Sequence, residues 1–284
     1  MSSARLNLGI DQLPTQALSP NAADTQTAVL SLESRSAVFI SDLHLHSNIP
    51  ALNHALSCFI ADFLQTPHQC LFILGDLFEY WAGDEELTEP YYAQLAGLLS
   101  QVAAAGRQLF IMHGNRDLLL GERFMSAASA TLLPDPTILV LEQERILLTH
   151  GDAYCTDDID YQVFRQQVRQ PAWQTQFLAL PLAQRQQIIQ NIRSESSQAK
   201  QQKSMQIMDV NQHAIDALWP QYGVQLIIHG HTHRPASHQH DHGQRWVIPD
   251  WRIDKQGQVA AGYLLWQKGG PLQLHRSLSL FNAA

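Results

Sequence analysis

Aspartate, asparagine and histidine residues gather in five short motifs along the 284-residue chain. The motifs are Asp-Leu-His at 42–44, Gly-Asp at 75–76, Gly-Asn-Arg-Asp at 114–117, His-Gly-Asp at 150–152 and Gly-His-Thr-His at 230–233. Each motif is weak evidence by itself, because such pairs are common in turns. Together they indicate a metal centre of carboxylate, amide and imidazole ligands, which suits Mn²⁺ and similar divalent ions.

The spacing within the motifs agrees with this chemistry. In an extended segment, residues two apart point to the same side, so Asp42 and His44 can reach one ion. Gly75 lets the backbone turn and approach closely just before Asp76. Two ions about 3.5–4 Å apart can acidify a bridging water and neutralise phosphoryl oxygens. The motifs therefore predict hydrolysis at phosphorus.

Each motif follows a short apolar run that predicts a buried strand. The runs occupy residues 37–40, 71–74, 109–112, 146–149 and 226–229. Helical patterns at about 50–65 and 90–105 separate the first three, which predicts an α/β fold with ligands at the carboxyl ends of the strands. After residue 244, the segments RWVIPDW and AAGYLLWQ predict antiparallel strands that complete a sheet.

The composition limits the partners that we expect. Hydrophobic residues make up 45% of the chain and the formal net charge is −8, as in a soluble globular protein without a nucleic-acid partner. No apolar run of about 18 residues or signal-peptide pattern is present, so we expect no membrane-spanning helix. Three cysteines without a C-x-x-C pair favour reduced thiols in the cytoplasm.

The order D-x-H, G-D, G-N-x-D, H-G-D, G-H-x-H resembles the calcineurin-like metallophosphoesterase superfamily from about residue 37 to 235. The resemblance implies a layered α/β/β/α sandwich and a centre of two divalent ions, for which the ligand types favour Mn²⁺. It implies one ion held by Asp42, His44, Asp76 and His233, and a second held by Asp76, Asn115, His150 and His231. It also implies catalytic roles for Asp76, Arg116 and His150. A non-catalytic scaffold would require a degraded ligand set, whereas every ligand position is filled here.

One position departs from the commonest superfamily form. Where many members have G-N-H-D, with a histidine that assists catalysis, this chain has Arg116. An arginine does not donate a proton near neutral pH, but it clamps phosphate oxygens in a bidentate manner. Two roles remain open for Asp117: holding the guanidinium of Arg116, or a structural role at the strand end.

With segments 75–86, 150–169, 203–211 and 228–235, this form of the motif makes residues 37–251 resemble the UDP-2,3-diacylglucosamine diphosphatase family of lipid A biosynthesis. The resemblance implies water attack on the α-phosphorus of this lipid-linked nucleotide sugar. It implies substrate contacts from Asn115, Arg116, Asp158, Ser196, Lys200, Lys203 and His231, although Lys200 departs from the small polar residue expected there. It also implies peripheral contact with the cytoplasmic face of the inner membrane. The alternative is a dimetal phosphoesterase for a soluble nucleotide or phosphodiester.

The domain organisation follows from the same pattern. We expect residues 1–35 to be a flexible N-terminal extension and residues 36–284 to form one metallophosphoesterase domain in a monomer. Residues from about 157 to 205 lack a strand signal and predict a helical insertion that caps the domain. Its apolar residues fit either a groove for acyl chains or, as is more common, a packed core. We expect the tract His238, His240 and His242 to be a solvent loop.

Overall fold

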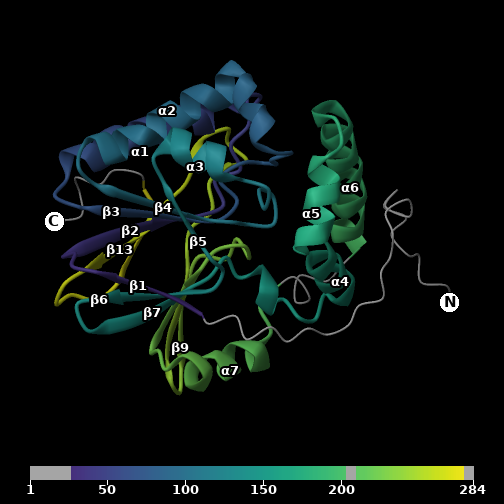
Figure 1. Cartoon of the computed structure of the whole chain (residues 1–284). Coiled ribbons are helices and arrows are strands. Elements are labelled where there is room, and N and C mark those ends of the chain that lie inside the picture. The colour runs from purple at the N-terminus through teal and green to yellow at the C-terminus, as the bar shows by residue number, and fades with distance from the viewer. Residues whose placement is uncertain (1–26, 203–208, 278–284) are drawn as a thin grey trace.

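Two six-stranded sheets lie face to face at the centre of the computed structural model, which describes residues 27–202 and 209–277 (Figure 1). The first sheet has the order β14-β13-β2-β3-β4-β5. Its strands are β2 (Ser36–Ile40), β3 (Cys70–Leu74), β4 (Gln108–Met112), β5 (Thr131–Leu133), β13 (Tyr263–Gln267) and β14 (Gln273–His275). Strands β2 to β5 are parallel, with Val38, Leu71 and Leu109 in register. Their carboxyl ends therefore meet at one edge.

The second sheet mixes parallel and antiparallel pairs in the order β1-β6-β7-β8-β10-β9. Its strands are β1 (Ala28–Leu32), β6 (Thr137–Leu141), β7 (Glu144–Leu148), β8 (Leu226–His229), β9 (Ser237–His240) and β10 (Gly243–Val247). Strands β7 and β8 are parallel, so the fourth and fifth motifs, which follow them, also lie at one edge. A small hairpin of β11 (Arg252–Ile253) and β12 (Val259–Ala260) completes the strands of the described chain.

Helices cover the outer face of each sheet (Figure 1). These are α1 (Pro50–Gln65), α2 (Pro90–Ala104) and α3 (Glu122–Ala128) on the first sheet, and α7 (Gln212–Tyr222) on the second. Between the sheets, the rings of Phe39, Phe72 and Phe110 stack at centroid distances of 5.0 and 4.8 Å. They share this core with Leu148 and Ile228 of the second sheet. The predicted layered α/β/β/α sandwich is thereby confirmed.

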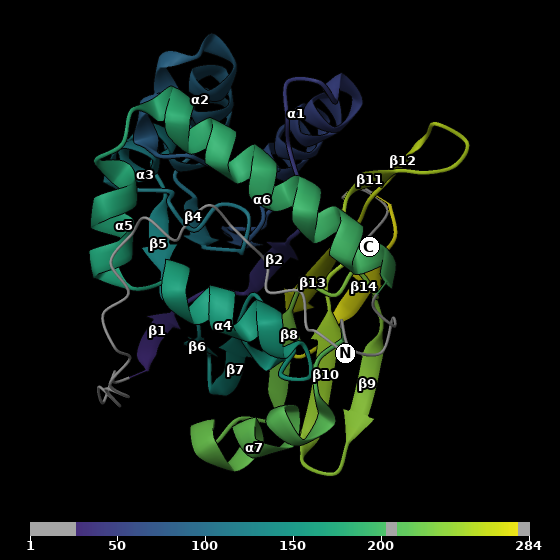
Figure 2. The ribbon, with the colours of Figure 1, turned by 90° about the vertical axis from the view of Figure 1, so that its right-hand side faces the viewer.

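Three helices, α4 (Ile159–Val168), α5 (Pro171–Leu178) and α6 (Leu182–Gln202), lie beside the two sheets (Figure 2). The fixed φ of Pro171 suits the first turn of α5, where its missing N–H is not needed. The guanidinium of Arg185 on α6 is buried and lies 2.7 Å from Oε1 of Glu85, in the 3-10 helix Asp84–Thr88. This ion pair attaches α6 to the loop that follows β3. Among the described residues, no helix is both long and apolar enough to cross a membrane.

The structure corrects three expectations about strands. Residues 28–32, expected within a flexible extension, form β1, whose alternating half-buried pattern is typical of an edge strand. Strand β10, in the segment expected to be antiparallel, pairs in parallel with β8 and antiparallel with β9. His238 and His240, expected in a loop, lie in β9. β1 and β9 lie at the edges of the second sheet, where polar or exposed residues interrupt the continuous apolar run that identifies a central strand.

Candidate metal centre

The five motifs converge at the carboxyl ends of strands β2, β3, β4, β7 and β8. Two groups of three side chains bring their nitrogen and oxygen atoms within 4.8 Å of one another. The first group consists of Asp42, His44 and His233, and the second group of Asp76, His150 and His231. The structure thus brings together residues that lie on both sheets and far apart in sequence.

In the first group, two imidazoles face each other. The Nε2 atoms of His44 and His233 are 3.2 Å apart, and Nε2 of His233 is 3.5 Å from Oδ1 of Asp42. Burial alone would raise the pKa of Asp42, but its contact with His233 lowers that pKa well below the usual range. The carboxylate also accepts a 2.9 Å hydrogen bond from the backbone N–H of His231. An ionised carboxylate with two converging ring nitrogens fits a cation.

In the second group, Asn115 joins the two histidines. Its Oδ1 atom lies 3.1 Å from Nε2 of His150 and 2.9 Å from Nδ1 of His231. Asp76 directs Oδ1 towards His150, at 3.7 Å from Nε2, and Oδ2 towards His44, at 4.0 Å from Nε2. One carboxylate oxygen therefore faces each group, as a bridging ligand requires.

The candidate ligands have an unusual backbone. The values of φ are positive at Asp42 (55°), His44 (49°), Asp76 (52°), His231 (66°) and His233 (54°). Residues other than glycine rarely adopt this left-handed region, and the cost of order 1–3 kcal/mol is typically found at functional sites. Asp42 and His44 do reach the same group, but the extended segment expected for them is wrong. The left-handed turns, rather than strand alternation, bring their side chains together.

Two glycines make room for these side chains. A Cβ atom on Gly75, whose φ is 89°, would lie 2.4 Å from Nδ1 of His150. One on Gly114 would lie 2.0 Å from Oδ1 of Asp76. Both positions therefore require glycine, and the close approach predicted for Gly75 is confirmed.

Burial and nearby carboxylates set the protonation of the second group. Burial lowers the pKa of His231 to about 4, and that of His44 in the first group also to about 4. Both rings are therefore neutral near neutral pH, with a lone pair free to bind a cation. Burial acts in the same direction on His150, but the carboxylates of Asp76 and Asp152 raise its pKa to about 9. The carboxylates of the centre thus favour positive charge beside them, on His150 or on a bound ion.

The side chain of Asp117 has the structural role. Its carboxylate accepts hydrogen bonds of 2.7 Å from the backbone N–H of Leu77 and 2.8 Å from that of Gly114. Burial, with the charge of Asp76, raises the pKa of Asp117 to about 6. The guanidinium of Arg116 pairs with Glu79 and not with Asp117. Its Nη1 atom lies 3.6 Å from Oε1 of Glu79. Sequence reasoning missed Glu79, although it follows the Gly-Asp motif by only three residues.

Two of the expected substrate residues outside the centre, Asp158 and Ser196, lie at the start of α4 and on α6. Asp158 caps α4, accepting a 3.2 Å hydrogen bond from the backbone N–H of Tyr161. The ring of Tyr161 stacks on that of His231, at a centroid distance of 6.0 Å. Ser196 is exposed on α6. Lys203 and the side chain of Lys200 lie outside the described residues.

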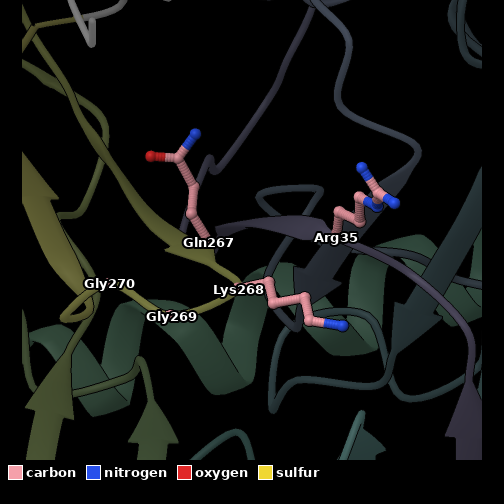
Figure 3. Close-up of a pocket in the computed structure, with 5 residues that line it drawn as sticks. All are labelled: Arg35, Gln267, Lys268, Gly269 and Gly270. Carbon is pink, nitrogen blue, oxygen red and sulfur yellow. The ribbon is translucent and has the colours of Figure 1, made fainter.

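A hollow of about 560 Å³ lies at the opposite end of the first sheet (Figure 3). It is lined by Arg35, Gln267, Lys268, Gly269 and Gly270. The Lys268 ammonium is 2.7 Å from Oε1 of Glu142, so a carboxylate already neutralises it. Neither metal-ligand group includes a residue of this hollow. The candidate site is therefore the one at the carboxyl ends of the strands.

The comparison with known families agrees with this geometry. Residues 36–235 match the family model described as calcineurin-like phosphoesterase. This chain belongs to the calcineurin-like phosphoesterases. Membership makes it a metal-dependent hydrolase, and confirms the predicted superfamily and enzyme class. The family implies divalent ions, and the two groups of oxygen and nitrogen ligands fit them.

Relatives within this phosphoesterase family share most of the chain. A protein of Aromatoleum aromaticum is 49% identical over 243 residues, which are 83% of this chain and 95% of that protein. One of Chromobacterium violaceum is 46% identical, covering 86% of this chain and 98% of its own. Both bear the name UDP-2,3-diacylglucosamine hydrolase. Among solved structures, a dimetal phosphatase from Danio rerio is 10% identical, covers 87% of this chain and 100% of its own, and has a TM-score of 0.44.

Proposed function

We propose that this protein hydrolyses the pyrophosphate of UDP-2,3-diacylglucosamine in lipid A biosynthesis. Water attack on the α-phosphorus would give UMP and 2,3-diacylglucosamine 1-phosphate. The observation that carries the proposal is the 49% identity to a relative named for this substrate, over 95% of that relative's length. The two groups of ligands at the strand ends provide the chemistry that such a reaction needs.

Two Mn²⁺ ions fit the proposed centre best, because its ligands are oxygen and imidazole nitrogen without thiolate. Asp42, His44 and His233 would hold one ion, and Asn115, His150 and His231 the other, with Asp76 shared between them. When bound, such ions supply Lewis acidity and an activated water at neutral pH.

The protein side chains would position and neutralise the substrate. Arg116 offers a planar guanidinium beside the centre, which suits two oxygens of a phosphate. The Nδ1 atom of His150 lies 2.9 Å from the carbonyl oxygen of Leu74, so this contact fixes which ring nitrogen faces the centre. The stacked ring of Tyr161 similarly holds the plane of His231. These contacts keep the donor atoms in place before substrate arrives.

The lipid part of the substrate would lie against the insertion of residues 157–205. On α4, Ile159 and Val163 are one turn apart, and their exposed fractions are 72% and 56%. Large apolar side chains this exposed suit acyl chains or the surface of a bilayer. Asp158, Ser196, Lys200 and Lys203 would contact the glucosamine and phosphate groups. A monomer in peripheral contact with the cytoplasmic face of the inner membrane fits this arrangement.

Metal removal and substrate comparison test the proposal together. Treatment with EDTA should abolish hydrolysis of UDP-2,3-diacylglucosamine, and Mn²⁺ should restore it better than Mg²⁺ or Zn²⁺. Equal or better turnover of a dinucleotide polyphosphate or a phosphodiester would contradict the lipid substrate and favour the soluble alternative. In ¹⁸O-water, label in UMP supports attack at the α-phosphorus, whereas label in the sugar phosphate contradicts it.

A further inference from the structure

Glu79 lies between the first group and helix α6. We propose that Glu79 is a positioning residue: it orients the ring of His44 for metal binding and joins this ligand to Arg116 and to α6. The inference rests on the proposed function, because it takes His44 to be a metal ligand. It adds a carboxylate that does not touch the ion and acts through its neighbours.

The contact with His44 is the first step of the argument. Nδ1 of His44 is buried and makes no hydrogen bond of good geometry, and Oε2 of Glu79 lies 3.3 Å from it. The other ring nitrogen, Nε2, faces His233 and Asp76. Histidine ligands of metals commonly donate the N–H of their second nitrogen to a carboxylate, which fixes the tautomer. The two atoms are already close enough, so a small rotation of either side chain would complete that hydrogen bond.

The second oxygen of Glu79 serves two cations. Its Oε1 atom forms an ion pair with the guanidinium of Arg193 on α6 and lies 3.6 Å from Nη1 of Arg116. The guanidinium of Arg193 also lies over the ring of Tyr80, 5.8 Å from its centroid. One carboxylate therefore holds a candidate ligand, a candidate phosphate clamp and the insertion helix.

Removal of the negative charge of Glu79 would act on the metal centre in two ways. The His44 ring would lose the acceptor that fixes its orientation. The positive charges of Arg116 and Arg193 would also lose their shared counter-ion, and would then oppose a divalent cation nearby. Glu79 is only 23% exposed, so solvent screens this interaction less than it would a surface pair. Weaker metal binding follows from both effects.

Glu85 provides a matched control. It lies in the same loop after β3 and also attaches α6, through the 2.7 Å contact with Arg185. Its carboxylate pairs with an arginine of the insertion helix just as that of Glu79 does. A variant at Glu85 therefore removes a comparable charge and a comparable contact with α6. Comparison of the Glu79 variants with the Glu85 variants therefore separates a role in docking α6 from a role in positioning His44.

The test is Mn²⁺ binding by the metal-free full-length protein, measured by calorimetry for Glu79→Gln, Glu79→Ala, Glu85→Gln and Glu85→Ala. We expect Glu79→Ala to weaken binding at one site by about tenfold or more. Glu79→Gln should have a smaller effect, because it keeps an acceptor for His44. Both Glu85 variants should bind within about twofold of the unaltered protein. Glu79 variants should also raise KM, because Arg116 loses its partner.

Unchanged metal binding in both Glu79 variants would overturn the inference. Equal weakening in the Glu79 and Glu85 pairs would overturn it too, since Glu79 would then only dock the helix. Thermal unfolding identifies a variant that does not fold, and Glu79→Asp then replaces it. The Mn²⁺ affinity of Glu79→Asp should lie between the affinity of Glu79→Gln and that of the unaltered protein. Absence of Mn²⁺ binding by the unaltered protein would refute the metal centre itself. Normal metal binding without turnover of the lipid substrate would refute the proposed substrate alone.

Discussion

The two ends of strand β2 carry different kinds of charge. At its carboxyl end, Asp42 is buried on left-handed backbone and faces two histidines. Before its first residue, Arg35 is exposed and lines a hollow with Lys268, whose charge Glu142 already neutralises (Figure 3). The hollow has ample volume, whereas the carboxyl end has buried charge and a costly backbone. Buried charge and backbone conformation, rather than the size of a cavity, therefore distinguish the candidate site.

The largest effect should come from Asp76→Ala at the carboxyl end. This change removes the carboxylate whose oxygens face both groups, so we expect reduced bound metal and a fall in kcat/KM of at least about a thousandfold. Elemental analysis after dialysis and steady-state kinetics measure the two effects. Full activity with two bound ions would refute the bridging role.

A smaller effect is expected for Arg116→Ala. Loss of the guanidinium removes a group placed to neutralise phosphate, which should lower kcat/KM by about a hundredfold. Bound metal should stay nearly unchanged, because a protonated guanidinium offers no lone pair to an ion. Kinetics combined with metal analysis test this. If metal is lost in the variant, the assignment of Arg116 to substrate is wrong.

Alanine substitutions at two glycines with positive φ, one near each end of the strands, compare these ends directly. Gly75→Ala and Gly269→Ala both add a Cβ at positive φ, with values of 89° and 76°. Each change should cost about 1 kcal/mol through the backbone. Only the Cβ at Gly75 meets His150, so we expect an additional loss of stability and weaker metal binding there. Thermal unfolding and metal titration are the measurements. Equal losses of stability and equal metal affinities in the two variants would contradict the proposed difference between the two ends.

The smallest effect is expected at the hollow. Lys268→Ala removes an exposed ion pair with Glu142, which should change the free energy of unfolding by less than about 1 kcal/mol. Neither kcat/KM nor bound metal should change, because the hollow lies at the far end of the strands. Chemical denaturation and kinetics check both. A clear loss of activity would mean that this end takes part in function.

The central elements of the fold could be predicted because their residues are buried on both faces. The run Cys70–Leu74, for example, is apolar throughout and forms the middle of the first sheet. Edge strands carry no such signal: β9 contains His238 and His240, and β1 alternates between half-buried and exposed residues. Their positions depend on pairing partners that lie elsewhere in the chain.

The order of the motifs identified side chains that converge in the two groups, but it did not reveal their geometry. Left-handed φ at Asp42 and His44 does not follow from residue type, because these residues prefer other regions and only the assembled fold holds them there. The partners of Arg116 and Asp117 were uncertain for a similar reason. A guanidinium reaches several carboxylates, and Glu79 is within its range because the loops after β3 and β4 lie side by side: the backbone N–H of Arg116 donates to Asp76, and its carbonyl accepts from Trp81.

The facing rings of His44 and His233 come from positions 189 residues apart. By the time the growing chain reaches His233, eight of the twelve strands of the two sheets have been synthesised, and the first group cannot exist before then. A divalent ion held by this group would therefore bind the folded chain far better than the unfolded one. At a free concentration of 100 times its dissociation constant, it would add about 2.7 kcal/mol to the free energy of unfolding. The supply of the ion would thus set part of the stability of this protein as well as its activity.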